Sequence, residues 1–166
     1  MRTDQLLAAA FDNIEGVVRG AVEGLTPAQL AQAPRAEANT ISWLVWHLTR
    51  IQDDHVAEVA GHEQVWTAQG WATRFDLPFD VTETGYDAQP HEVAAVRADA
   101  ELLLGYHAAV HEKTAAYLAT LSDDDLSRVV DERWDPPVTL GVRLVSVVTD
   151  DLQHAGQAAY VRGLLT

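Results

Sequence analysis

The amino-acid sequence predicts an all-α protein folded as a four-helix bundle. Apolar residues make up 48% of the 166 residues, which is enough for one core. Alanine and leucine dominate, and runs of Val, Ile and Thr of strand length are scarce, so the composition favours helices. Four long segments repeat apolar residues at spacings of three and four, with caps and helix breakers between them. No strand, internal repeat or second domain is expected, so residues 1–166 are predicted to form a single domain.

Two long helices are expected in the first part of the chain. The first covers residues 3–25, where one apolar stripe follows the helical period, and Thr26-Pro27 then opens a short turn of helix. A polar linker at residues 34–39 leads to Thr40, which is expected to cap the second helix. This helix is expected over residues 41–60 and is closed by Gly61. The first half of this second helix is apolar on nearly all sides, which predicts that it lies deep in the core.

Residues 62–90 are expected to form a short helix and then a long loop over one end of the bundle. Aromatic residues and helix breakers are mixed in this segment, and long loops inside compact domains are often functional. Its aromatic side chains either help to shape a pocket or belong to the core. They include Trp66, Trp71, Phe75 and Tyr86.

Two more long helices are expected after this loop. The third covers about residues 90–121, with a break near Arg97, and residues 122–125 resemble a capping box for a short turn. A break at residues 134–137 precedes the last helix, which Thr139 caps and which reaches about Leu164.

Composition restricts the partners and the chemistry. The formal net charge is −14, so nucleic acid and anionic membranes are poor partners. No cysteine is present, which excludes disulfides, thiolate ligands from the chain and a cysteine nucleophile. The N-terminal residues lack the features of a signal peptide, and no apolar run approaches the roughly 20 residues that span a bilayer, so a cytoplasmic location is expected.

Three residues on two helices are candidates for metal binding. His47 stands in the most apolar stretch of the chain, and Asp150 and His154 are four residues apart, so they share one face of the last helix. That face continues through Val147, Ala158 and Val161, which indicates that it turns inward. A buried acid and two imidazoles would be costly to desolvate without a cation, so we expect a metal site at His47, Asp150 and His154.

Other interpretations of the same residues stay open. Asp150 could instead form an ion pair with a protonated His154, and Asp151 is a rival ligand, although it points about 100° away from Asp150. His107 and His111 have the same four-residue spacing, but their charged neighbours favour a partly solvated face. The other histidines at positions 55, 62 and 91 are expected at the surface.

Two segments resemble the DinB-like superfamily. One comprises residues 43–48 (WLVWHL) with Arg50 and residues 53–54, and the other comprises residues 150–163 (DDLQHAGQAAYVRG). The group most similar to this chain contains mycothiol-dependent, maleylpyruvate isomerase-like enzymes. This resemblance covers most of the chain.

The resemblance implies a four-helix bundle, often dimeric, in which three side chains hold a divalent metal. His47 matches the histidine of the first motif and His154 the second histidine of a His-x-x-x-His pair, where this chain has Asp150 in first place. Zinc is favoured, with nickel, iron or manganese as alternatives, and three ligands leave room for a substrate or a low-molecular-weight thiol. A homodimer is expected.

The expected function is therefore that of a metal-dependent enzyme acting on a small-molecule substrate. Its reaction would be thiol transfer, as in a mycothiol-type S-transferase or isomerase, or hydrolysis. The alternative is a non-enzymatic stress or accessory protein in which the ion only stabilises the bundle. A plain interaction module would bind no metal.

Overall fold

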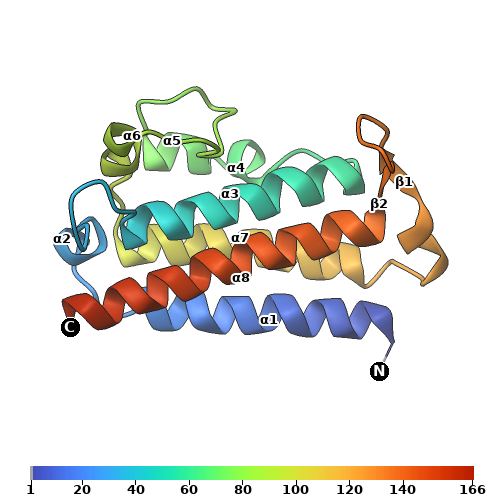
Figure 1. The fold of residues 1–166 in the computed structure, drawn as a ribbon, viewed down its shortest axis with the longest axis horizontal. Helices are drawn as coiled ribbons and strands as arrows, with labels where there is room; N and C mark the ends of the chain where they lie inside the picture. Colours follow the sequence, from blue (N-terminus) through green and yellow to red (C-terminus); the bar gives the residue numbers. More distant parts are fainter. Residues whose placement is uncertain (1) are drawn as a thin grey trace.

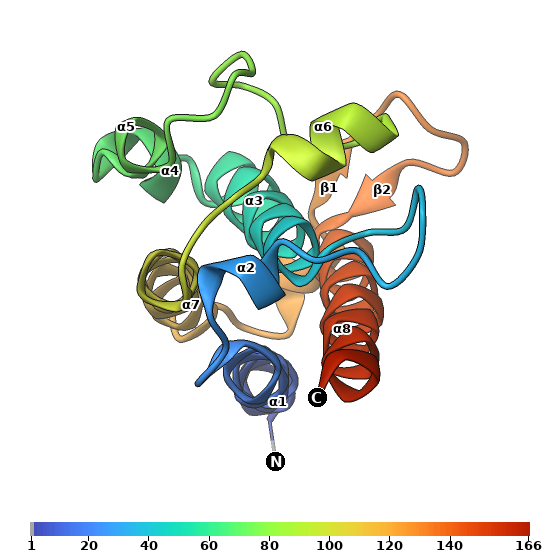
Figure 2. The same ribbon diagram turned by 90° about the vertical axis from the view of Figure 1, so that its left-hand side faces the viewer.

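Four long helices form the bundle in the computed structural model, which describes residues 2–166. These helices are α1 (Thr3–Val22), α3 (Ile41–Ala60), α7 (Ala100–Leu118) and α8 (Leu140–Leu165). They form a ring in which α8 and α7 each pack against both α1 and α3 (Figure 2). The predicted all-α four-helix bundle is confirmed.

The connection between α3 and α7 travels back along the length of the bundle. It must do so because α3 and α7 run in the same direction, opposite to α1 and α8 (Figure 1). The connection carries α4 (Val65–Ala68), α5 (Trp71–Phe75) and α6 (Pro90–Ala95). We call residues 61–99 the crossover segment. Its course places a long irregular stretch of chain against the outer side of α3.

Several element boundaries differ from the sequence-based expectation. The break near Arg97 is confirmed, because α6 and α7 are separate helices. The crossover segment holds two short helices before its loop instead of one. The expectation of no strands was wrong: β1 (Val129–Asp131) and β2 (Val138–Thr139) form a small antiparallel hairpin beside the start of α8. Strands this short carry no readable alternation of apolar and polar residues.

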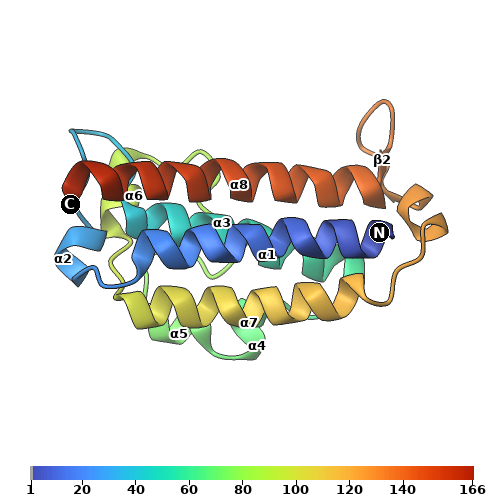
Figure 3. The same cartoon turned by 90° about the horizontal axis from the view of Figure 1, so that it is seen from below.

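The remaining short elements lie at the two ends of the bundle. They are α2 (Pro27–Leu30), which joins α1 to α3, and a 3₁₀ turn at Asp124–Ser127 before the hairpin. Seen from below, α8 lies beside α1 and extends beyond it towards the C-terminus (Figure 3). Within residues 2–166, no helix is long and apolar enough to cross a membrane.

Side-chain caps start α3 and α8 where the sequence predicts them. The Thr40 hydroxyl accepts a hydrogen bond from the Trp43 amide, and the Thr139 hydroxyl accepts one from the Val142 amide. Gly61 ends α3 in the left-handed conformation at φ +73°. The whole run from Ile41 to Arg50 is buried, as its apolar character predicts.

Most aromatic residues of the crossover segment belong to the core. Trp66, Trp71 and Phe75 are buried and lie around the Tyr106 ring of α7, with ring centroids 5.2–5.8 Å from it. Core packing is therefore the better interpretation for these three. Tyr86 differs, since 85% of its surface is exposed.

A buried polar network fastens the crossover segment to α3. The Asp53 carboxylate accepts hydrogen bonds of 2.8 Å from the Val65 and Trp66 amides and from the Tyr106 hydroxyl. Arg50, which is fully buried, donates to the Gln64 side chain at 2.7 Å and to the Glu83 carbonyl at 3.1 Å. Burial raises the pKa of Asp53, while these amide donors and Arg50 oppose that rise.

Candidate metal centre

The structure brings His47, Asp150 and His154 together between α3 and α8. Each offers one ligand atom, and these atoms lie within 4.8 Å of one another. The rings of His47 and His154 are 4.8 Å apart between centroids, and His154 Nε2 lies 3.6 Å from Asp150 Oδ1. His47 is buried, whereas the other two are partly exposed. The sequence-based prediction that these residues meet is in agreement with this geometry.

The helix face that carries Asp150 and His154 borders the core. Val147, Ala158 and Val161 on the same face are buried, as expected from the sequence. The Oδ2 atom of Asp150 is inaccessible to solvent and has no hydrogen-bond partner among the described residues. A buried carboxylate oxygen without a partner is costly, and a cation between the three side chains would remove that cost.

A backbone carbonyl of the crossover segment fixes the orientation of His47. Nδ1 of His47 lies 2.6 Å from the Thr84 carbonyl oxygen, so Nδ1 carries the proton and donates it. The Nε2 lone pair is then free to face the centre. Burial lowers the pKa of His47, although the hydrogen bond to Thr84 opposes this effect, and the neutral form is the one that binds metal ions.

The other imidazole also has a hydrogen-bond acceptor on Nδ1. Nδ1 of His154 lies 2.9 Å from the side-chain oxygen of Gln157 and donates to it. Its Nε2 faces Asp150. Both imidazoles therefore have an outer partner on Nδ1 and an available Nε2, which is the usual arrangement around a histidine-bound metal ion. The residues present fit a divalent ion.

Gly85 allows the crossover segment to approach His47 closely. Its φ is +88°, and a Cβ atom at this position would lie 2.9 Å from both Nδ1 of His47 and the Trp46 ring. Trp43 is stacked on the His47 ring at 4.6 Å between centroids, and the same Cβ atom would lie 3.4 Å from it. Sequence analysis missed Thr84 and Gly85, because a backbone carbonyl carries no residue-type signal and one loop glycine is a weak one.

The rival candidates do not join this cluster. Asp151 is fully buried on another side of α8, and neither of its carboxylate oxygens has a hydrogen-bond partner within residues 2–166. Burial, and next the charge of Asp150, raise the pKa of Asp151 well above its ordinary value. A neutral carboxyl on the wrong side of the helix is a poor substitute for Asp150.

His107 and His111 lie elsewhere in the bundle, and the expectation of a partly solvated face was wrong for His107. Its side chain is buried against α3, where Nδ1 lies 3.2 Å from the Thr49 hydroxyl. Burial lowers the pKa of His107 to about 4. His111 pairs with Asp12 of α1 at 3.1 Å. His107 faces the apolar interior of the bundle, whereas the charged residues near it in the sequence, Glu112 and Lys113, face the solvent.

The remaining histidines also lie outside the centre. His62 and His91 are exposed as expected, while His55 is half-buried and accepts a hydrogen bond from Arg143 at 3.3 Å. Arg143, the charged exception on the Asp150 face, is further held by Asp131 at 3.1 Å. These contacts account for both side chains without a metal ion.

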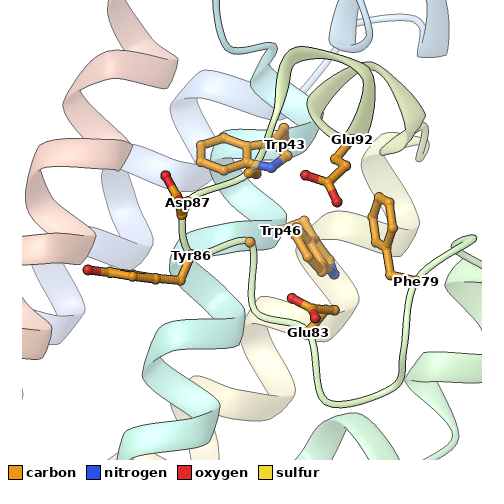
Figure 4. Close-up of a pocket in the computed structure, with 9 residues that line it drawn as sticks. Trp43, Trp46, Phe79, Glu83, Tyr86, Asp87 and Glu92 are labelled. Carbon is orange, nitrogen blue, oxygen red and sulfur yellow. The ribbon is translucent and has the colours of Figure 1, made fainter.

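A pocket of about 240 Å³ adjoins the centre on the side of the crossover segment. Trp43 forms part of its wall as well as covering His47, and Gly85 also belongs to both (Figure 4). Tyr86 lies at its margin and points away from the other lining side chains (Figure 4). Of the aromatic residues expected to shape a pocket, Tyr86 does so, together with Trp43, Trp46 and Phe79.

Comparison with known proteins identifies relatives over nearly the whole chain. The family model described as mycothiol-S-transferase matches residues 6–166. A crystal structure described as the conserved protein of a locus from Enterococcus faecalis is 34% identical in sequence and has a TM-score of 0.92. That match covers 99% of this chain and 98% of the other. No curated protein matches the chain.

Replacing Gly85 should weaken metal binding at His47. In Gly85→Ala the added methyl group would displace the loop and lengthen the His47–Thr84 hydrogen bond. Because outer partners of this kind hold the imidazole in place, we expect zinc affinity to fall about 10- to 100-fold, as measured by competition with a chromogenic chelator.

Gly24→Ala provides the matched control for this experiment. Gly24 has a similar φ of +80°, but a methyl group added there would have no described atom within 4 Å. The variant should carry the same backbone strain and leave zinc affinity unchanged. Equal zinc affinity in Gly85→Ala and Gly24→Ala would contradict the role given to Thr84 and Gly85.

Proposed function

The chain belongs to the mycothiol S-transferase family, and we propose that it is a divalent-metal-dependent enzyme that transfers a low-molecular-weight thiol, as its thiolate, to a second substrate. One observation carries this proposal: two imidazoles with available Nε2 atoms and one carboxylate converge within 4.8 Å. The family indicates the class of thiol. Because the chain has no cysteine, the reacting sulfur comes from a small molecule.

Zinc is the ion that we propose for this centre. It accepts imidazole nitrogen and carboxylate oxygen and binds soft sulfur well, although nickel, iron and manganese are compatible with the same donors. When bound, such an ion would hold a thiol in its thiolate form and leave it nucleophilic at neutral pH. His47 and His154 would supply neutral nitrogen ligands. Asp150 would supply a negative charge that offsets part of the positive charge of the ion.

The exposure of the centre supports catalysis over a purely structural role. The side chains of Asp150 and His154 are 36% and 19% exposed, so a small molecule can reach the space between them. Structural zinc sites are closed by four protein ligands, whereas catalytic sites keep a position open. Three residues meet here, and none of the other described His, Asp or Glu side chains completes a fourth corner. The weaker alternative is a non-enzymatic protein in which the ion only stabilises the helix bundle.

The first prediction from this proposed function concerns metal content. Protein purified without a histidine tag should bind one divalent ion per chain, measured by elemental analysis after incubation with zinc, nickel, manganese and iron salts. His154→Ala should lose most of this metal because it removes one of three ligands. His107→Ala/His111→Ala is the matched control, since it removes two imidazoles at the same spacing outside the cluster.

Two results would contradict the assignment. A wild-type protein that stays metal-free with all four ions would refute the metal centre. Loss of metal from the His107/His111 variant, with retention in His154→Ala, would move the centre to α7.

Thiol binding provides the second prediction. Titration calorimetry of zinc-loaded protein with mycothiol and other small thiols should show binding that releases a proton. Affinity should strengthen as pH rises towards the thiol's own pKa, roughly 8.5 for a cysteine-like thiol, because less work is then needed to remove that proton. If no thiol binds better to the loaded wild type than to His154→Ala, a water-activating hydrolase becomes the better proposal.

The third prediction concerns assembly, since we propose a homodimer in the cytoplasm. The outer face of α8 exposes apolar side chains without exposed charges between them, which suits contact between two chains of net charge −14. These side chains are Val142, Val145, Leu152, Tyr160 and Leu164. Light scattering at micromolar concentrations should give the mass of two chains. A monomeric mass would contradict the dimer and leave the metal centre untouched.

A further inference from the structure

The pocket beside the metal centre combines aromatic walls with carboxylates. Trp43, Trp46 and Phe79 form its apolar surfaces, and Glu83, Asp87 and Glu92 contribute acidic groups. Figure 4 shows the Glu92 carboxylate directed toward the space between the two tryptophan rings, with Glu83 on the far side of Trp46. None of the described residues that line the pocket is basic.

Such a lining has a definite chemical preference. The face of an indole or phenyl ring attracts cations, and this attraction grows when the cation is partly desolvated. Carboxylates attract the same cations over a longer range. A bare metal ion is a poor match, because these three carboxylates do not converge: the described residues contain one cluster of metal-ligand type, and it is at His47. An organic cation suits both parts of the wall.

Trp46 supplies a second and independent indication of a ligand. Its side chain is 1% exposed, and its Nε1–H has no hydrogen-bond partner among the residues described. In Figure 4 this nitrogen faces the space between Phe79 and Glu83. A buried indole N–H normally finds an acceptor, and leaving it unpaired is costly. An oxygen atom on the bound molecule would provide that acceptor.

We propose that this pocket binds a small organic ammonium group that carries a neighbouring oxygen acceptor. The rings of Trp43 and Trp46 contact the ammonium, Glu83 and Asp87 attract it, and Trp46 Nε1 donates to the oxygen. Glu92 contributes charge while its Oε2 also accepts a hydrogen bond from the Gln89 amide at the start of α6. A cavity of about 240 Å³ accommodates a group of this size.

The position of the pocket suggests what the ammonium group belongs to. Trp43 separates the pocket from the metal centre, with its ring 4.6 Å from that of His47. None of the three candidate ligands lines the pocket, so a molecule anchored there by its ammonium would reach the centre only with a part that extends past Trp43. We assign the pocket to the second substrate, the one that receives the sulfur; this role rests on the proposed function, whereas ammonium binding itself does not.

Choline and its neutral carbon isostere, 3,3-dimethylbutan-1-ol, test the charge preference directly. The two molecules have nearly the same shape and the same hydroxyl group, and they differ in one positive charge. Calorimetry or tryptophan fluorescence with metal-free wild-type protein should show choline binding at least about fivefold tighter than the isostere. Equal affinities would overturn the proposal.

Variants then locate the binding site. Glu83→Gln/Asp87→Asn keeps the shape of the pocket and removes two charges, and it should weaken choline binding about three- to tenfold. Glu112→Gln/Asp124→Asn is the matched control, because both residues are exposed and lie outside the pocket. An equal loss in both double variants would show that choline senses only the overall charge, and the assignment would fall.

Trp46→Phe tests the oxygen acceptor separately. It keeps an aromatic face and removes the N–H, so the preference for choline over tetramethylammonium should fall about fivefold. An unchanged preference would remove the oxygen from the proposal. Metal-free protein is used throughout, so these results are independent of the thiol titration: choline binding without thiol binding would refute the proposed function alone, and the converse would refute the ammonium site alone.

Discussion

The burial of Arg50 is the constraint on which the functional end of this molecule depends. A guanidinium group taken out of water costs several kcal/mol unless it is paired and hydrogen-bonded. Here Asp53 lies 3.9 Å away, Gln64 and the Glu83 carbonyl accept hydrogen bonds, and the Trp66 ring covers the charge at 4.9 Å. Every one of these partners except Asp53 lies on the crossover segment. The charge can therefore stay buried only while that segment is held against α3.

The metal centre and the pocket both inherit their geometry from this attachment. Glu83, whose carbonyl Arg50 holds, directly precedes Thr84, whose carbonyl orients His47. Gly85 follows and closes over the same imidazole, and Glu83 itself lines the pocket. Residues 83–85 thus connect the buried Arg50, the orientation of the His47 ring and the wall of the pocket. A change that frees Arg50 from the loop should affect all three, even though Arg50 is neither a candidate ligand nor a residue that lines the pocket.

Sequence reasoning found what side-chain periodicity and spacing encode. The four long helices, the caps at Thr40 and Thr139, and the convergence of His47 with Asp150 and His154 all follow from patterns within one helix or from a known motif. The loop contacts at Thr84 and Gly85 could not be found, because they depend on the path of a crossover segment without periodicity. Burial of His107 was missed for another reason: its charged sequence neighbours face solvent around the same helix.

Electrostatics connects the acidic composition to the chemistry at this end of the bundle. With a divalent ion bound, Asp150 and two neutral imidazoles would leave one net positive charge, which a single thiolate would neutralise. Beyond Trp43, the carboxylates of Glu83, Asp87 and Glu92 then dominate the local field, on a chain whose net charge is already −14. A second anion would be repelled from this surface, whereas a cationic molecule would be concentrated at it. The same field would therefore oppose the meeting of two thiolates here and would favour an encounter between one thiolate and a positively charged acceptor.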